Sequence, residues 1–561
     1  YVDPKDPSFA SVSSKEKGTL QTTGSTSYTW NMNALLYYNK AIKKHFINAT
    51  AGLNAQASKG TNTNILYKGF QLSNLHSPAY AADQPDKASV SESEDRLVGL
   101  LGAVNYSYDD IYMAEFNMGY NGTENFAKGK RFGFFPAVSL GWVISEEKFF
   151  PKNNIVKYLK VRGSYGEVGN DQIGGDRFLY LPSSYGAASD SGVNKYNFGL
   201  ASNPYTSLMI VENKIGNPDL TWEKAKKMNV GVDLNLFNNC LTASFDIFKE
   251  KRNNILANRS TSPMIIGANL PAYNFGEMEN RGWEMDLNFR HHIQDFHYWA
   301  RFNYSFARNE IIYMDEVQKR YDYQMTTGRR KNQFFGLIFD GYYNSWEEIN
   351  ALDRPKSSWS GNQLQPGDVK YVDVNQDGVI DDYDMVPIGY TPVPEIVYGF
   401  SFGAQYKGFD FSILFQGADN VSIKYFGRSM WPFAKGEESA KSLIKERWTQ
   451  ERYEAGEKIT FPRLSLNPNG ETDHNYRPST LWIRDASYLR LKNLEVGYTF
   501  TGGFVKRLNL NSVRLYFNGS NLFTWTDVVD LDPEAPSRSG NVEINTYPLQ
   551  KVYNIGLNIN F

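Results

Sequence analysis

The sequence predicts an all-β protein, a transmembrane antiparallel β-barrel with short periplasmic turns and long extracellular loops. Three observations predict this fold. Many segments alternate apolar and polar residues with a period of two, aromatic residues make up 15% of the 561 residues, and the connections alternate between short and long. A strand with one apolar and one polar face fits a wall between lipid and water, and aromatic residues gather at both edges of such a wall.

Composition narrows the class of protein further. The net charge is −2 and the mean hydropathy is −0.50, and no apolar run approaches the ~18 residues of a membrane helix. Lysine and arginine (59) do not exceed aspartate and glutamate (61), which argues against nucleic acid as a partner. A single cysteine, Cys240, excludes a disulfide framework within the chain.

The last residues, "VYNIGLNINF", show the alternation most clearly. Tyr553, Ile555, Leu557, Ile559 and Phe561 lie on one face of a strand, and polar residues or glycine lie on the other. The same rule predicts about fifteen strands, at 26–38, 45–57, 98–108, 112–120, 134–144, 158–165, 228–237, 241–248, 283–289, 298–306, 398–406, 409–415, 484–500, 511–523 and 550–561.

One predicted strand changes its alternation. In "YLRLKNLEVGYTF" the apolar positions shift between Leu491 and Leu494. A β-bulge near Lys492–Asn493 would restore the apolar face. The alternative is that residues 484–492 lie beyond the membrane, where no face has to be apolar.

The connections between the strands separate into two groups. The short ones fall near 39–44, 109–110, 237–239, 290–295 and 406–408, with moderate ones at 145–155 and 501–510. The long ones fall at 58–94, 166–218, 252–271, 309–394, 418–483 and 524–549. Only the modest connection 121–131 departs from the alternation. Outer-membrane barrels carry their long loops at one end. A soluble β-sandwich or propeller is the alternative, disfavoured by this asymmetry and by the absence of a blade-like repeat.

Several segments also resemble a known family. "FGFFPAVSLGWVISEEKFF", "LKVRGSYGEVGN", "GDVKYVDVNQDGVIDDYDMVPIG", "DASYLRLKNLEVGYTF" and "VRLYFNGSNLFTWT" are similar to barrel segments of SusC/RagA-type TonB-dependent transporters, and the resemblance covers nearly the whole chain. It implies a multi-pass protein of the cell outer membrane that actively imports oligosaccharides or peptides. It also implies a barrel of about 22 strands around an N-terminal plug, a SusD-like surface lipoprotein as a lid, and energy supplied through TonB.

The predicted strand count is lower than the family's. We therefore expect residues 1–25 to be an extracellular loop and residues 26–561 to be the C-terminal part of the barrel, with the plug and the TonB contact in an N-terminal part outside this sequence. The alternative is a passive porin or surface adhesin complete in this chain. An outer-membrane enzyme is disfavoured because no nucleophile–base constellation stands out.

The sharpest local motif is "DVNQDGVIDDYD", within a calcium-type loop at 368–386. Calcium prefers hard oxygen ligands spaced as in D-x-N-x-D-G, with an acid at position twelve. The motif predicts a structural calcium in an extracellular loop, bound by Asp373, Asn375, Asp377, the Val379 carbonyl and Asp384, with Asp381 direct or through water. The alternative is an acidic turn held by side-chain to backbone hydrogen bonds.

The remaining candidate motifs do not indicate a catalytic or metal site. We interpret His291, His292 and His297 as solvated turn residues, "GEVGNDQIGG" as a loop rather than a phosphate cradle, and 437–455 as a loop helix. Four loop aromatics are candidates for stacking on sugars or for contact with a lid, although packing between loops is favoured: Trp346, Trp359, Trp431 and Tyr425. No catalytic residue and no ligand-binding residue is predicted.

The alternation also predicts which substitutions the barrel tolerates. Leu234 lies on the predicted lipid face, so a charge there should impair assembly, whereas its neighbour Asp233 faces the lumen and should tolerate change.

Overall fold

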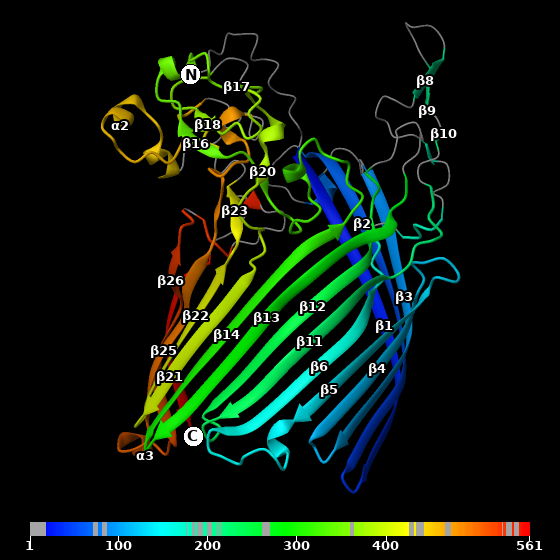
Figure 1. Ribbon diagram of the computed structural model, residues 1–561, viewed down its shortest axis with the longest axis vertical. Coiled ribbons are helices and arrows are strands. Elements are labelled where there is room, and N and C mark those ends of the chain that lie inside the picture. Colours follow the sequence, from blue (N-terminus) through cyan, green and yellow to red (C-terminus); the bar gives the residue numbers. More distant parts are fainter. Residues whose placement is uncertain are drawn as a thin grey trace.

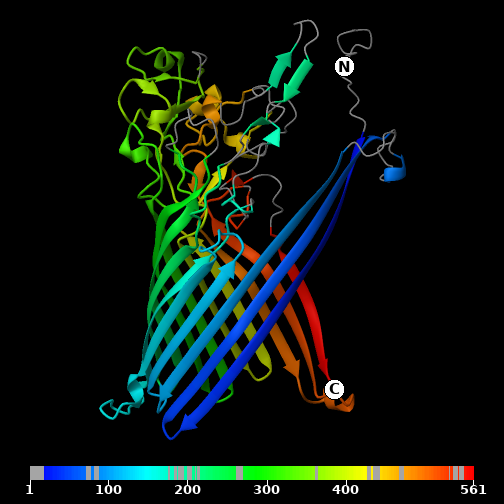
Figure 2. The ribbon, with the colours of Figure 1, turned by 90° about the vertical axis from the view of Figure 1, so that its right-hand side faces the viewer.

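The computed structural model is dominated by one antiparallel sheet of fifteen strands that curves into a barrel wall (Figures 1 and 2). It describes residues 18–70, 77–80, 87–174, 177–181, 186–187, 195–198, 205–208, 210–211, 215–260, 270–359, 364–425, 431–433, 442–465, 473–529, 531–534, 541–542 and 549–561. Neighbours in the sheet follow one another along the chain, as expected for an up-and-down barrel. Among the described residues no helix has the length and apolarity that crossing a membrane requires.

The strands of this sheet match the predicted ones in number and order. They are β1 (Gly18–Ile42), β2 (His45–Phe70), β3 (Lys87–Tyr108), β4 (Tyr112–Thr123), β5 (Phe132–Val143), β6 (Val156–Asn170), β11 (Glu223–Leu236), β12 (Leu241–Ala257), β13 (Tyr273–Ile293), β14 (Phe296–Tyr313), β21 (Ile396–Tyr406), β22 (Phe409–Asp419), β25 (Tyr488–Phe500), β26 (Ser512–Thr526) and β28 (Val552–Asn560).

Many strands are longer than the alternation predicts. β1 begins at Gly18 rather than at residue 26, and β2 and β3 take up most of the predicted loop 58–94. The part of the predicted loop 1–25 before Gly18 lies outside the described residues. Much of these extensions, such as "SKGTNTN" and "SESED", is polar on both faces, so the strands pair their backbones there without giving a period-two signal.

The bulge predicted near Lys492–Asn493 is confirmed. Leu414 of β22 lies opposite Asn493 and Phe415 opposite Leu491, so Lys492 is the extra residue. The register between β25 and β26 shifts at the same place. Before the bulge, the even-numbered residues Arg490 and Lys492 lie on the inner face of β25. After it, the odd-numbered residues Glu495 and Gly497 lie on that face, because one extra residue shifts every later residue to the opposite face.

The tight hairpin turns meet at one end of the wall and the long connections at the other (Figure 1). The exception is the pair around β5, because the connection 124–131 at the long end is shorter than the connection 144–155 at the short end. At the short end, Lys407 and Gly408 both have positive φ values, 44° and 92°, the conformation that a two-residue hairpin turn requires.

Three long connections at the other end pack together above one side of the wall, and we call them the loop assembly: the described residues of 314–395, 420–487 and 527–551. Its core contains Leu337, Val369, Tyr425, Phe461, Trp482 and Val528, which come from all three connections. Its elements are β15 (Phe335–Gly336), β16 (Phe339–Tyr342), α1 (Trp346–Ile349), β17 (Lys356–Ser357), β18 (Val369–Tyr371), β19 (Val379–Ile380), β20 (Val386–Pro387), β23 (Ser422–Tyr425), α2 (Gln450–Glu454), β24 (Ile483–Asp485) and β27 (Asn541–Val542).

The remaining elements are short. They are β7 (Gly186–Ala187), β8 (Lys195–Phe198), β9 (Tyr205–Leu208) and β10 (Ile210–Val211) above the wall, α3 (Phe504–Arg507) at the short end, and 3₁₀ turns at Pro78–Tyr80, Ile144–Glu146, Asp322–Gln324, Asp382–Asp384, Ser442–Glu446 and His474–Tyr476. The loop helix predicted at 437–455 is wrong as one element. Residues 442–446 and 450–454 form separate short helices, and 437–441 lie outside the described residues.

Candidate functional site

The inner face of the wall carries a band of hydrogen-bonded polar residues. At its centre Arg162 of β6 donates to Asp233 of β11 at 3.0 Å and to both carboxylate oxygens of Asp246 of β12 at 2.6 Å. Ser244 donates to Asp233 at 3.0 Å. The network joins three strands. Asp233 holds Arg162, so its substitution would leave that arginine with one partner fewer. The tolerance expected at Asp233 stays a prediction.

A second inner-face network repeats this plan across the barrel. Arg514 of β26 donates to Asp410 of β22 at 3.0 Å and pairs with Glu495 of β25 at 2.6 Å. In both networks a glycine lies beneath the arginine. An added Cβ at Gly231 would lie 2.7 Å from the Arg162 guanidinium, and one at Gly497 would lie 2.7 Å from that of Arg514. The glycines let each arginine lie flat across a neighbouring strand.

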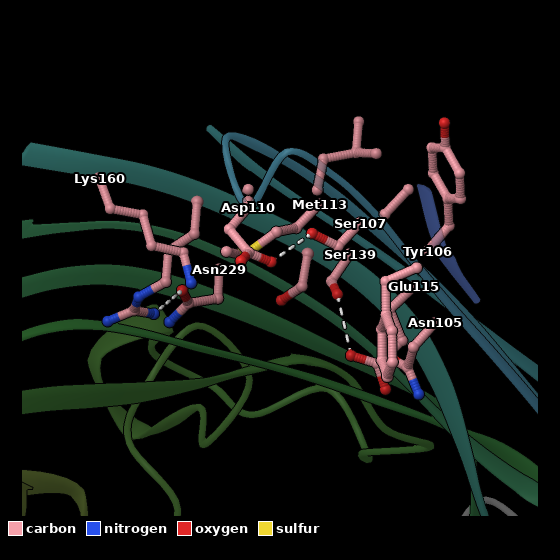
Figure 3. Close-up of a pocket in the computed structure, with 16 residues that line it drawn as sticks. Asn105, Tyr106, Ser107, Asp110, Met113, Glu115, Ser139, Lys160 and Asn229 are labelled. Carbon is pink, nitrogen blue, oxygen red and sulfur yellow. Dashed lines mark hydrogen bonds between the residues drawn. The ribbon is translucent and has the colours of Figure 1, made fainter. Parts of the chain in front are cut away.

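Beside the first network the wall is hollowed into a half-open depression of about 440 Å³ (Figure 3). Its polar lining includes Asn105, Glu115, Ser139, Lys160 and Asn229. Ser139 donates to Glu115 at 3.3 Å. Amides, hydroxyls and charges of both signs, spread over β3 to β11, offer hydrogen bonds to a polar solute without the geometry of a reaction centre.

The loop after β26 is anchored to the inner wall by a buried ion network. Arg490 of β25 donates to Asp532 at 2.7 Å and to Glu534 at 2.9 Å, and Lys492 at the bulge reaches Glu534 at 3.1 Å. Tyr488 donates to Glu534 at 2.7 Å. A buried arginine with two carboxylates fixes a loop strongly, because removing any partner leaves a charge uncompensated.

The calcium-type loop folds as a tight acidic turn within the loop assembly. Asp373 accepts a hydrogen bond from Gly378 N at 2.8 Å, and Asp377 accepts one from Val379 N at 2.9 Å. Buried Asp384 accepts from the amides of Val374 and Asp381, each at 2.8 Å. Gly378 has a φ of +81°, as the sharp turn requires.

The carboxylates of this loop are directed mainly at backbone amides. Asp373 Oδ1 is the exception, since it is buried without a hydrogen-bond partner. Burial raises the pKa of Asp384, and the nearby carboxylate of Asp373 adds to that effect. Over the described part of the chain, no three His, Cys, Asp or Glu side chains converge closely enough to hold a metal. The calcium assignment to Asp373, Asn375, Asp377, Val379, Asp381 and Asp384 stays a prediction.

The predicted loop aromatics divide into packed and exposed residues. Tyr425 is buried in the core of the loop assembly, and Trp359 and Trp431 pack against that core. Arg477 lies 4.1 Å from the Trp359 ring centroid. Trp346, at the start of α1, is 56% exposed. Three of the four predicted aromatic residues therefore pack within the loop assembly, and of the four only Trp346 is mostly exposed to solvent.

The histidines of the β13–β14 hairpin lie where a solvated turn was expected. His292 and His297 are exposed cross-strand partners beside the turn at residues 294–295, with ring centroids 5.5 Å apart. His291 faces the other side of the hairpin and contacts Tyr298. By contrast His474, which the sequence did not single out, is buried in the loop assembly between Val369 O and Ser357 Oγ at 2.8 and 2.9 Å.

A curved antiparallel wall with an apolar outer face, a charged inner face and structured loops at one end defines a β-barrel of the outer membrane. The chain belongs to the TonB dependent receptor-like β-barrel family, whose sequence model matches residues 6–522. The predicted family and outer-membrane location are thereby confirmed. The family consists of transporters, which agrees with the prediction that the chain is not an enzyme.

Known relatives and solved structures support this placement. TonB-dependent receptor P3 of Formosa agariphila is 27% identical over 94% of this chain and 52% of its own length. TonB-dependent receptor SusC of Bacteroides thetaiotaomicron is 26% identical over 98% of this chain and 54% of its own length. The RagAB peptide importer in its 'open-open' state shares the fold, with a TM-score of 0.73 at 22% identity over 96% of this chain and 55% of that one. The chain spans about half the length of the curated relatives it matches.

Proposed function

We propose that the protein containing this chain is an active importer of oligosaccharides or peptides in the outer membrane, powered through TonB. The observation that carries the proposal is the polar inner wall, with its two arginine networks and the depression beside Asn229, beneath a packed loop assembly. Such a wall can line a path for a polar solute. Family membership supports coupling to TonB.

The oligosaccharide and peptide alternatives both remain in the proposal. RagAB, which shares the fold, is a peptide importer. The depression beside Asn229 offers amide and hydroxyl groups, which suit sugars and peptide backbones alike. The uptake experiment described next distinguishes oligosaccharides from peptides as the imported ligand.

Uptake in cells tests the proposal against a passive porin or a surface adhesin. Cells that produce the full-length protein would be given labelled neutral oligosaccharides or a labelled peptide pool, with TonB present or deleted. We expect uptake of one pool that is lost without TonB. Uptake that persists without TonB would favour a passive porin, and surface binding without uptake would favour an adhesin.

We propose further that a SusD-like lipoprotein docks on the loop assembly as a lid. The loop assembly exposes two large apolar side chains, Trp346 at 56% and Leu352 at 105%, which a docked lid would cover. The double substitution Trp346→Ser and Leu352→Ser should reduce co-purification of the lipoprotein. Exposed Leu508, at the other end of the wall, provides the control Leu508→Ser. If the unaltered protein, the double variant and Leu508→Ser all recover the same amount of lipoprotein, the proposed docking site is contradicted.

We also propose that further strands of the same polypeptide close the barrel. Within the described residues β1 and β28 are the two edges of the sheet, and in Figure 2 they diverge toward the end marked C. In lipid every backbone group has to be paired, so free edges are not tolerated. An intact native polypeptide near 63.9 kDa, with β1 paired to β28, would overturn this proposal and favour the porin complete in this chain.

A further inference from the structure

Basic residues form a row on the outer face of the wall where its apolar surface ends. Lys249 of β12 lies opposite Arg281 of β13, which lies opposite Arg308 of β14. One step along the same strands, on the same face, the cross-strand row is Ile247, Trp283 and Phe306. Side chains two apart in a strand share a face, so the basic row borders the lipid-facing surface directly.

The side chain of Arg308 supports this assignment of faces. Its guanidinium carbon lies 5.5 Å from the centroid of the Phe306 ring. Arg308 therefore lies beside the apolar row rather than in the lumen.

A loop adds two more arginines to this row. Residues 328–330 run alongside the end of β14, where Gly328 N donates to Ile311 O and Ile311 N donates to Arg329 O, each at 2.8 Å. Between the loop and the strands lies a half-open cavity of about 400 Å³. Its lining includes Arg281, Arg308, Arg329, Arg330 and one acid, Glu310.

The charges around this cavity do not balance. Arg308 donates to Glu395 at 2.8 Å, and Arg330 pairs with the same buried carboxylate, so two arginines share one acid. Lys249 is paired with Glu279 at 2.9 Å. Within the described ranges neither Arg281 nor Arg329 makes an ion pair, and both side chains are exposed.

With Glu310 and Glu395 counted against the four arginines, the cavity has a net charge of +2. Like charges opposite each other destabilise a sheet. An anion bound between Arg281 and Arg308 would remove that cost.

We propose that this cavity binds the phosphate group of an outer-leaflet lipid, whose acyl chains lie along Ile247, Trp283 and Phe306. Arginine forks bind phosphate in a bidentate manner. Four arginines line this cavity, and two of them, Arg281 and Arg329, make no ion pair within the described ranges. The apolar row begins one strand step away, which favours a lipid over a free anion. Imported solute is not the expected occupant, because Arg281 and Arg308 lie on the outer face.

The test compares lipid binding to the purified full-length protein and its variants. Native mass spectrometry would follow titration with phosphatidic acid, with phosphatidylcholine, and with inorganic phosphate. The site variant carries Arg281→Gln and Arg329→Gln, neither of which breaks an ion pair. The control is Arg301→Gln, an exposed arginine of β14 at an inward position, whose guanidinium carbon lies 5.4 Å from the centroid of the Trp299 ring.

We expect phosphatidic acid to bind the unaltered protein and the control more tightly than phosphatidylcholine does. Each arginine near a lipid surface contributes about fivefold to binding, so the double variant should bind about 25-fold more weakly. Equal binding to the double variant would overturn the proposal. Binding of inorganic phosphate as tight as that of phosphatidic acid would also overturn it, in favour of a free-anion site. Arg329→Gln alone, in the loop, repeats the test if the double variant does not fold.

Discussion

Arg162 of β6 and Asp246 of β12 are joined by two hydrogen bonds of 2.6 Å although β11 lies between them. Gly231 of β11 is the direct cross-strand partner of both residues, and its missing side chain leaves the space that the guanidinium crosses. The inner wall is thus tied across three strands by side chains as well as by backbone pairing.

The glycine beneath Arg162 should be sensitive to a single methyl group. A Cβ at Gly231 would lie 2.6 Å from Asp246 Oδ1 and 2.7 Å from the Arg162 guanidinium, so Gly231→Ala should destabilise the barrel by about 1–3 kcal/mol. The measurement is thermal unfolding followed by heat-modifiable mobility on gels. Gly163→Ala is the matched control, because the nearest atom there is 3.8 Å away. Equal melting of both variants would show that Arg162 moves aside without cost.

Charge on the outer face should be far more costly than charge on the inner face. Leu234→Lys should impair membrane assembly by up to about 2–4 kcal/mol, depending on its depth in the bilayer. The neighbouring Asn235→Lys, at the same height but facing the lumen, should assemble normally. Asn235 replaces Asp233 as the control because Asp233 binds Arg162. Assembly is measured as the folded fraction recovered in outer membranes, and similar losses for both variants would contradict the assignment of faces.

Acid should loosen the loop assembly through His474. Burial lowers the pKa of His474 below its ordinary 6.5, an effect that Arg477 reinforces and that Val369 O, Asp368 and Asp473 oppose. The unfolded chain therefore binds the proton more readily, so stability is present at neutral pH and is lost as pH falls through 6.5. The slope attributable to this group approaches about 1.4 kcal/mol per pH unit. Limited proteolysis at pH 5 and pH 7.5 should show faster cleavage in acid, and His474→Gln should reduce the difference. An equal acid effect in that variant would assign it to other groups.

Calcium should bind the loop 373–384 weakly, with a dissociation constant on the order of 10⁻⁴–10⁻³ M. Its oxygens would have to turn from backbone amides toward the ion, and the unpartnered Asp373 Oδ1 is the first available. Isothermal titration of the full-length protein is the measurement. Asp377→Ala should abolish binding, whereas Asp382→Ala, an exposed neighbour outside the predicted ligand set, should not. No heat of binding, or the same heat in both variants, would leave the loop as an acidic turn.

The sequence predicted those strands of the protein that have lipid on one face and water on the other. Residues such as Val230 and Asn229 alternate because one meets lipid and the other water, and the bulge at Lys492 was visible as a break in that pattern. The outer ends of β1 to β3 were missed because water on both faces imposes no alternation.

The loop assembly was missed for a different reason. Its core joins Leu337, Tyr425 and Val528, which lie far apart in the chain, and no local period records such contacts. The Arg162 and Arg281 clusters likewise arise from register between strands. Their signal in the sequence is a charged residue at the same step of adjacent strands, which can be recognised only once those strands are aligned.

That the strands form a membrane wall with alternating faces is tested most directly by spin labels along β14. Single cysteines at residues 300 to 305, in a background with Cys240→Ser, would be labelled in the reconstituted full-length protein. We expect high oxygen accessibility at 300, 302 and 304, which share the face of Phe302, and high accessibility to a water-soluble nickel complex at 301, 303 and 305. Uniform accessibility along the six positions, or the opposite phase, would contradict a wall with these two faces.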